Sequence, residues 1–274
     1  MNIIEKVSIA KTGDEKDNED SFVITDSFVS VIDGMSPQER SIYHGVSPAQ
    51  IAVDLITNEI ESFPRTITYK EAADRLTNCI HDYYLKQDIL NEVSKYPHKR
   101  MGANLIILSK ERNEIWLMGD CHCLIDGLHV TNEKLIDHLI GEMRSQLIHK
   151  YLLKYSIEEL MESDYSREDI QPFLIQQYLY QNNHDESPLS YTVVDGFPMN
   201  YENIKVVKLE GVTTLVLASD GYPLLSDSLK DTEIQLKKLL RNDPLMCTIF
   251  KSVKGLKKGN ISFDDRTYVK VWVQ

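Results

Sequence analysis

The chain has 274 residues, of which 42% are hydrophobic and 26% are charged, and these proportions are typical of a folded globular protein. The formal net charge of −12 argues against a nucleic-acid-binding surface, which needs clustered positive charge. The sequence has no run near the roughly 18 apolar residues that a membrane span needs, and residues 1–6 do not form the start of a signal peptide. We therefore expect a cytoplasmic protein with no nucleic-acid or membrane partner, and its oligomeric state stays open.

The first half of the chain predicts two groups of strands separated by two helices. Strands are expected at residues 2–10 and 22–33, where Asp26-Ser27 marks a hairpin turn. Each of the two helices opens with a sequence typical of a capping box, Ser47 to Gln50 and Thr68 to Glu71. The next strands are expected at 103–109, 114–119 and 122–126.

The second half begins with a polar helical stretch over residues 132–181, in which Ser156 to Glu159 caps a short helix. Helices are also expected near 232–241 and 244–254, with Asp243-Pro244 as the cap and first residue of the second. The remaining expected strands are 191–194, 204–208, 213–218 and 267–273.

This order of elements indicates an α+β fold. Strands joined by short loops favour antiparallel sheets, and helix pairs between them can cover the outer faces. We predict a single domain over residues 1–274, built as a four-layer α-β-β-α sandwich with two central antiparallel sheets flanked by helix pairs. A divergent, mostly helical segment is expected at about 130–190.

Four short acidic motifs are spread over almost the whole chain, and three of them lie at the end of a predicted strand or just before one. Strand ends are places where a rigid scaffold can hold a carboxylate at a fixed point. If the motifs converge, two carboxylates about 4 Å apart repel each other by on the order of 4 kcal/mol, and hard divalent cations such as Mg²⁺ or Mn²⁺ would offset this repulsion. The motifs are Asn18-Glu19-Asp20, Ile32-Asp33-Gly34, Ala218-Ser219-Asp220-Gly221 and Phe263-Asp264-Asp265-Arg266-Thr267.

Each Asp-Gly pair also has a simpler interpretation, because Asp-Gly is a common turn dipeptide. Asp126-Gly127 is expected to be such a turn. Asp33 and Asp220 differ from it because a long apolar strand precedes each of them, and because Asp264-Asp265 follows near the end of the chain.

In their order and spacing, these motifs resemble those of the metal-dependent serine/threonine protein phosphatases of type 2C (PPM), in a divergent bacterial-type form. A fifth match is Gly102-Ala103-Asn104 leading to Met118-Gly119-Asp120, so the resemblance spans nearly the full chain. It implies two central antiparallel sheets with a two-metal site at one edge. The implied activity is hydrolysis of phosphoserine or phosphothreonine on a partner protein by a metal-activated water.

The resemblance also implies roles for individual residues. Asp33 would bridge both metal ions, the backbone carbonyl of Gly34 would bind one of them, and Asp220 and Asp264 would hold the other. The catalytic set is thus Asp33, Asp220 and Asp264, with Mg²⁺ or Mn²⁺ as the cofactor.

Three further residues are expected near this centre. Asp20, with Glu19 beside it, would hold metal-bound waters or ligate directly, and Asp120 matches the ligand of a third, weaker metal ion. The arginine that usually binds the substrate phosphate is missing, and Lys16 is the nearest candidate for its role. A lysine can bind phosphate but lacks the bidentate geometry of arginine.

One departure from the family pattern leaves a second function open. Many members carry a histidine after the Asp-Gly pair, where this chain has Met35. The alternative is therefore a weak or inactive pseudophosphatase that binds a phosphoprotein or another partner. An unrelated alternative is a metal-dependent enzyme that acts on small phosphate esters.

Overall fold

The computed structural model describes residues 1–185 and 187–273 and contains two five-stranded sheets. The strand order in the first sheet is β1-β10-β9-β6-β7, and all its pairings are antiparallel. Its strands are β1 Asn2–Ile9, β6 His122–Ile125, β7 Leu128–Val130, β9 Thr214–Ala218 and β10 Arg266–Trp272. Strand β7 was not predicted from the sequence.

The second sheet has the order β2-β3-β4-β5-β8 and is also antiparallel throughout. Its strands are β2 Asp20–Ile24, β3 Phe28–Met35, β4 Gly102–Ser109, β5 Glu114–Met118 and β8 Lys205–Lys208. The predicted hairpin turn at Asp26-Ser27 joins β2 to β3. Residues 191–194 do not form the predicted strand; they make only isolated bridges, between Val194 and Ala103 and between Tyr191 and Gln181.

Two clusters of apolar side chains pack on opposite faces of the second sheet, because successive residues of a strand point in opposite directions. In β4, Leu105 and Ile107 belong to the cluster shared with the helices, whereas Ile106 and Leu108 belong to the cluster between the two sheets. This explains why β4 is buried along its whole length.

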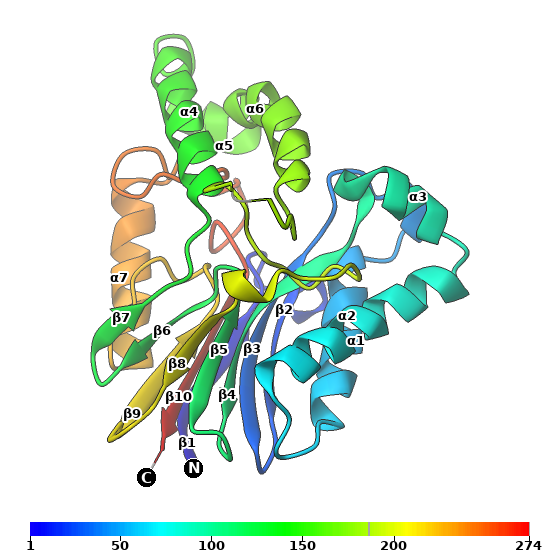
Figure 1. Ribbon diagram of the computed structural model, residues 1–274. Coiled ribbons are helices and arrows are strands. Elements are labelled where there is room, and N and C mark those ends of the chain that lie inside the picture. Colours follow the sequence, from blue (N-terminus) through cyan, green and yellow to red (C-terminus); the bar gives the residue numbers. More distant parts are fainter. Residues whose placement is uncertain (186, 274) are drawn as a thin grey trace.

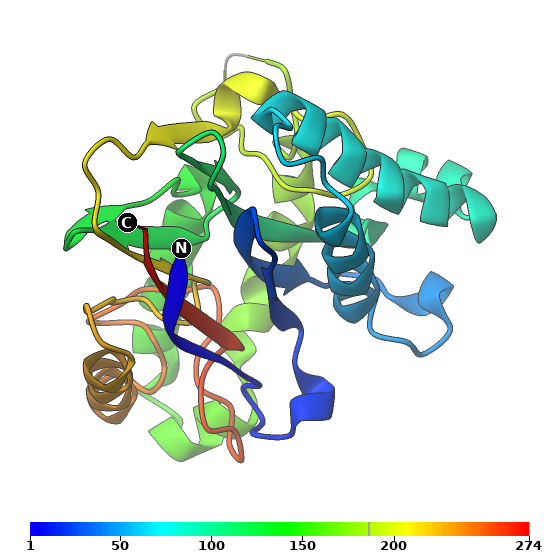
Figure 2. The same ribbon diagram turned by 90° about the horizontal axis from the view of Figure 1, so that it is seen from below.

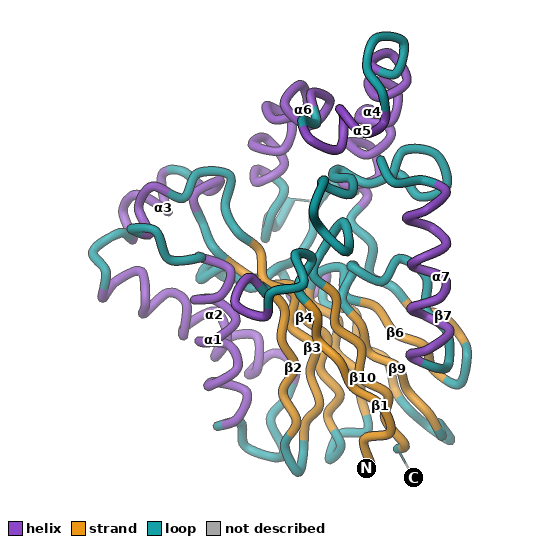
Figure 3. The backbone as a smooth tube through the Cα atoms, turned by 180° about the vertical axis from the view of Figure 1, so that it is seen from behind, coloured by secondary structure: helices purple, strands orange, loops and turns teal. Residues whose placement is uncertain are grey.

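Helices cover the outer faces of the sheets, as Figures 1 and 3 show. Helices α1 (Pro48–Glu61) and α2 (Tyr69–Lys86) lie against the second sheet, and the short α3 (Leu90–Lys95) follows them. Helix α7 (Leu229–Asn242) packs against the first sheet through a separate apolar cluster that includes Leu236 and Leu239. The predicted four-layer α+β architecture is confirmed, although the second outer layer contains one long helix instead of a pair.

The capping boxes at Thr68 and Ser156 are both present. The one predicted at Ser47 is only half formed. The Ser47 hydroxyl accepts a hydrogen bond from the Gln50 backbone N–H, but the Gln50 side chain donates to the carbonyls of Lys16 and Asn18 instead of returning to the cap.

The helix predicted near 244–254 does not form, and residues 243–265 follow an irregular path. At the start of this segment Asp243 favours the irregular path. Its carboxylate accepts hydrogen bonds from four consecutive backbone N–H groups, those of residues 247–250. These bonds satisfy the backbone without a helix.

Helices α4 (Leu135–Tyr151), α5 (Ile157–Glu162) and α6 (Tyr165–Gln176) form a group that stands over one end of both sheets (Figure 1). Both chain ends lie at the opposite end of the sheets, on the neighbouring strands β1 and β10, as the view from below also shows (Figure 2). No helix in the described part of the chain is long and apolar enough to cross a membrane.

The fully buried Arg144 on α4 connects this helical group to the irregular segment 243–265. Its guanidinium donates two hydrogen bonds to Asp164, at 2.6 and 3.0 Å, and one to the carbonyl oxygen of Ser252 at 2.8 Å. It also donates to the carbonyl oxygen of Leu245 at 3.0 Å. Arg144 therefore satisfies the Leu245 carbonyl, which a helix over 244–254 would have satisfied internally.

Replacing this guanidinium by an apolar side chain is expected to destabilise the fold. Arg144→Met leaves Asp164 and the carbonyl groups without their donor, and we expect a loss of about 3 kcal/mol in the free energy of unfolding, measured by urea denaturation. Arg241→Met, at an exposed position on α7, is the matched control and is expected to stay within about 0.5 kcal/mol of the wild type. Equal stability of the two variants would contradict this role of Arg144.

Candidate functional site

Two acidic motifs meet in the second sheet because of its antiparallel register. Asp20 opens β2, and its Cα partner on β3 is Asp33. Asp33 is in turn the partner of Asn104 on β4, and the Asn104 amide donates a hydrogen bond of 3.4 Å to the Asp33 carboxylate. Residues far apart in sequence therefore lie side by side at one end of this sheet.

The other two acidic motifs lie at the same end of the first sheet. Asp220 comes just after β9, and Asp264 comes just before β10, which is the antiparallel neighbour of β9. The Ser219 hydroxyl joins the two sheets at this end, since it donates a hydrogen bond of 2.6 Å to the Asp20 carboxylate and accepts one of 2.9 Å from the Thr267 backbone N–H.

A cleft of about 550 Å³ is lined by residues of these sheet ends and of the helices α4 and α6. Five of the expected site residues line it: Asp33, Gly34, Asp120, Asp220 and Asp264. Asp20 is 7% exposed and lies behind the lining residues, bonded to Ser219. Lys16 is exposed in the 3-10 turn Glu15–Asp17 and does not line the cleft.

The two glycines of the Asp-Gly motifs allow the acidic segments to approach closely. A Cβ atom on Gly34 would lie 2.2 Å from the carbonyl oxygen of Glu19, and one on Gly221 would lie 1.9 Å from the carbonyl oxygen of Asp265. Neither glycine has a positive φ. Asp33-Gly34 is thus not a turn but part of a strand, and each glycine is required by the backbone of another acidic motif.

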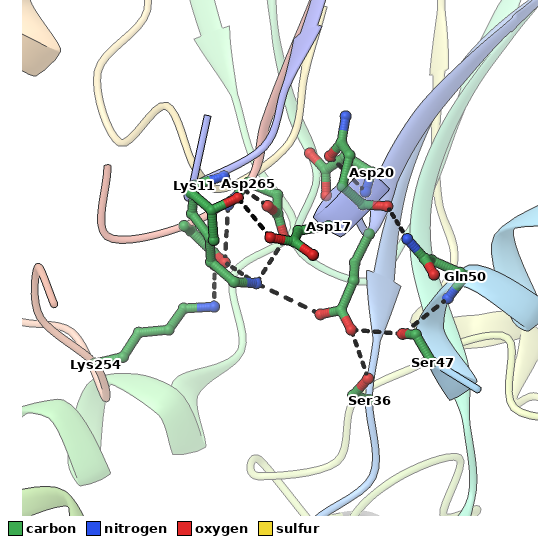
Figure 4. A network of polar contacts seen from close by, with 12 residues as sticks. Lys11, Asp17, Asp20, Ser36, Ser47, Gln50, Lys254 and Asp265 are labelled. Carbon is green, nitrogen blue, oxygen red and sulfur yellow. Dashed lines mark hydrogen bonds and ion pairs between the residues drawn. The ribbon is translucent and has the colours of Figure 1, made fainter. Parts of the chain in front are cut away.

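Glu19 holds the loops around this strand end through Ser36 and Ser47, which are labelled in Figure 4. Its carboxylate accepts hydrogen bonds from the hydroxyls of Ser36, at 3.0 Å, and Ser47, at 2.7 Å. Its backbone carbonyl accepts from the Gly34 N–H at 2.9 Å. Glu19 therefore connects the start of α1 with the end of β3 and fixes the position of Asp33.

Burial and mutual repulsion dominate the electrostatics of the acidic groups. Burial raises the pKa of Asp33 well above its usual range, and the negative charges of Asp220 and Asp20 raise it further. The pKa of Asp220 is raised in the same way, by burial and then by Asp264. Burial raises the pKa of Asp20 to about 7, although the hydrogen bond from Ser219 opposes this shift.

Three lysines that the sequence reasoning did not single out offset part of this negative charge. Lys11 pairs with Asp265 at 2.6 Å, Lys134 pairs with Asp120 at 2.8 Å, and Lys254 pairs with Asp264. All three line the cleft. Of the three lysines, only Lys11 has a signal in the sequence, because it follows directly after the first expected strand.

The chemistry of the donors fits a hard divalent cation, because the acidic groups that line the cleft offer only oxygen ligands. One carboxylate oxygen of Asp120, Oδ1, is buried without a hydrogen-bond partner. Within residues 1–185 and 187–273, however, no group of three or more His, Cys, Asp or Glu side chains is arranged so that it could hold a metal ion as it stands. The lysine pairs on Asp120 and Asp264 take up oxygens that such an arrangement would use.

No family model and no curated protein matches the chain. Similar solved structures include the PPM Ser-Thr phosphatase MsPP from Mycobacterium smegmatis in complex with cacodylate, with 11% identity, a TM-score of 0.49 and coverage of 100% of both chains. The serine/threonine phosphatase Stp1 from Staphylococcus aureus has 14% identity and a TM-score of 0.47, covering 98% of this chain and 94% of its own. The serine/threonine phosphatase PstP/Ppp of Mycobacterium tuberculosis has 14% identity and a TM-score of 0.46, covering 98% of both chains.

These proteins are serine/threonine phosphatases, the class whose motifs the motifs of this sequence resemble. At such identities and TM-scores, the likeness carries no argument about the activity of this chain. The case for an activity therefore rests on the residues of the cleft.

The raised pKa of Asp20 predicts a specific pH dependence of stability in metal-free protein. Asp20 keeps its proton up to about pH 7 when the protein is folded but only up to about pH 4 when it is unfolded. The protonated carboxyl therefore favours the folded state at low pH, and this contribution is lost as the pH rises from about 4 to about 7.

In EDTA, Asp20→Asn is expected to make the decline in the free energy of unfolding between pH 4 and pH 8 smaller by at least about 1 kcal/mol. Urea denaturation at several pH values measures it. Asp26→Asn, in the exposed turn between β2 and β3, serves as the control and should keep the wild-type decline. If the free energy of unfolding of Asp20→Asn declines as much as that of the wild type, Asp20 is not the group responsible.

Proposed function

We propose that this chain is a Mg²⁺- or Mn²⁺-dependent phosphoprotein phosphatase that hydrolyses phosphoserine or phosphothreonine. One observation carries the proposal: Asp33, Asp220 and Asp264, from three distant stretches of the chain, line one cleft at a common end of two sheets. Clustered carboxylates of this kind favour binding of divalent cations, because a cation removes their repulsion.

In this proposal Asp33 and the backbone carbonyl of Gly34 would hold one cation, and Asp33, Asp220 and Asp264 would hold the second. Asp120 is the ligand of a third, weaker site. Asp20 lies outside the cleft lining, so we assign it the positioning of water and of Ser219 instead of direct ligation. Cations bound there would lower the pKa of a water molecule and neutralise the phosphoryl oxygens of the substrate.

The residues of the chain then have two tasks besides holding cations. Asn104 orients the Asp33 carboxylate through its amide hydrogen bond, and Glu19 holds the adjacent backbone through the Gly34 N–H. The lysines that line the cleft provide positive charge for the phosphate, a role that the sequence resemblance suggested for Lys16. Lys11 and Lys254 lie in the cleft whereas Lys16 does not, so we regard them as better placed for it.

A protein substrate is consistent with the surroundings of the cleft. Its lining includes residues of α4, α6 and the irregular segment, such as Asp137, Arg167 and Lys251. These residues can contact the substrate residues that flank a bound phosphoserine or phosphothreonine. We propose that this helical segment, which has no counterpart in the motif pattern, selects the substrate protein. A cytoplasmic setting stays a prediction.

The alternative of a pseudophosphatase is favoured by a separate observation. Lys134 and Lys254 pair with two of the carboxylates that the enzyme would use for its cations. With Met35 in the place of the usual histidine, the cleft then resembles a site that binds a phosphate group through lysines without hydrolysing it.

Activity measurements test the enzymatic proposal directly. Hydrolysis of p-nitrophenyl phosphate and of phosphoserine and phosphothreonine peptides is expected with Mn²⁺ or Mg²⁺ and should disappear in EDTA. Asp33→Asn is expected to lower the rate at least about 100-fold, because it removes a charge that holds the cations and hence the groups that stabilise the transition state.

Asp126→Asn is the control, because Asp126 also precedes a glycine but belongs to the turn between β6 and β7, outside the cleft. It should keep the wild-type rate within about twofold. If the protein binds a phosphopeptide but shows no turnover with Mn²⁺ or with Mg²⁺, the enzymatic proposal is rejected and the pseudophosphatase is supported.

A further inference from the structure

Lys254 is the cleft residue whose position is least expected beside a metal site. Its ammonium pairs with the Asp264 carboxylate, one of the proposed cation ligands. The ammonium is also close enough to feel the negative charges of Asp220 and Asp33, and its pKa is raised because these carboxylates outweigh the lowering effect of burial. A positive side chain thus lies among the groups that would receive a divalent cation.

The backbone on both sides of Lys254 is fixed, whereas its side chain is partly exposed. Arg144 donates to the carbonyl oxygen of Ser252 at 2.8 Å, Arg167 donates to that of Val253, and the Leu256 N–H donates to the carbonyl oxygen of Pro244 at 2.8 Å. The Lys254 side chain keeps 35% of its surface exposed. Movement of the ammonium therefore requires only rotation of its flexible four-carbon stem.

The side chain enters the carboxylate network from the C-terminal segment, on the side opposite Ser36 and Ser47, as Figure 4 shows. It lines the same cleft as Arg40 and Lys134. A phosphate group bound beside Asp33 and Asp220 would accordingly lie within reach of a lysine that is released from Asp264.

We propose that Lys254 is an internal cation that exchanges partners. It neutralises Asp264 while no divalent cation is bound, competes with that cation for the carboxylate, and binds the phosphate group of the ligand once it is displaced. This inference rests on the proposed function, because it needs a divalent cation at Asp264.

Direct binding measurements test the competition without reference to turnover. Titration of Mn²⁺ into the full chain, followed by calorimetry, is expected to give an affinity at least about tenfold higher for Lys254→Met than for the wild type, because the competing charge is gone. Lys258→Met is the matched control: it removes one lysine from the same segment, but this lysine pairs with Glu162 and does not line the cleft. Its Mn²⁺ affinity should equal that of the wild type.

The second half of the exchange is measured with inorganic phosphate and Mg²⁺-saturated protein. Lys254→Met is expected to bind phosphate at least about tenfold more weakly than the wild type, and Lys254→Arg, which keeps the charge, should restore most of the affinity. Urea denaturation of each variant establishes that it is folded, and Lys254→Gln replaces Lys254→Met if the latter is not.

The outcomes separate this inference from the proposed function. If neither the wild type nor Lys254→Met binds Mn²⁺, both proposals are overturned. If the wild type binds Mn²⁺ but Lys254→Met shows the same affinity for Mn²⁺ or for phosphate, the phosphatase proposal stands and the exchange is overturned.

Discussion

Repulsion between carboxylates at one end of two packed sheets is the constraint on which the rest of this structure depends. Asp33, Asp220 and Asp264 share a cleft, and Asp20 lies directly behind it. Like charges in a partly buried place are unfavourable unless protons, lysines or metal ions offset them. The raised pKa values of Asp33, Asp220 and Asp20 and the three lysines that pair with carboxylates here are two consequences of that single constraint.

The scaffold brings these groups together through backbone pairing, not through contacts between the acidic side chains themselves. Antiparallel register sets Asp20 beside Asp33, and the loops that flank β9 and β10 leave their sheet at the same end. Gly34 and Gly221 then allow the backbones of the acidic motifs to touch. The apolar clusters on the faces of the sheets stabilise this arrangement against the charge repulsion.

The helical group α4–α6 and the irregular segment 243–265 close the other side of the cleft. Both depend on side chains that satisfy backbone groups, above all Arg144 and Asp243. Such contacts hold loops in defined positions without regular secondary structure. They also explain why Lys254 is presented to the carboxylates from a segment that is neither helix nor strand.

The sequence by itself determined the α+β class, most of the strands, the helices α1 and α2 and the acidic motifs, because alternation of apolar residues, capping sequences and strand-end carboxylates are local signals. Tertiary structure decided the rest. The helix expected near 244–254 is absent because Asp243 and Arg144 satisfy its backbone from positions that local sequence cannot relate. The positions of Lys134 and Lys254 could not be predicted for the same reason, because neither lysine belongs to a motif. Only the packing of distant segments places their ammonium groups beside Asp120 and Asp264.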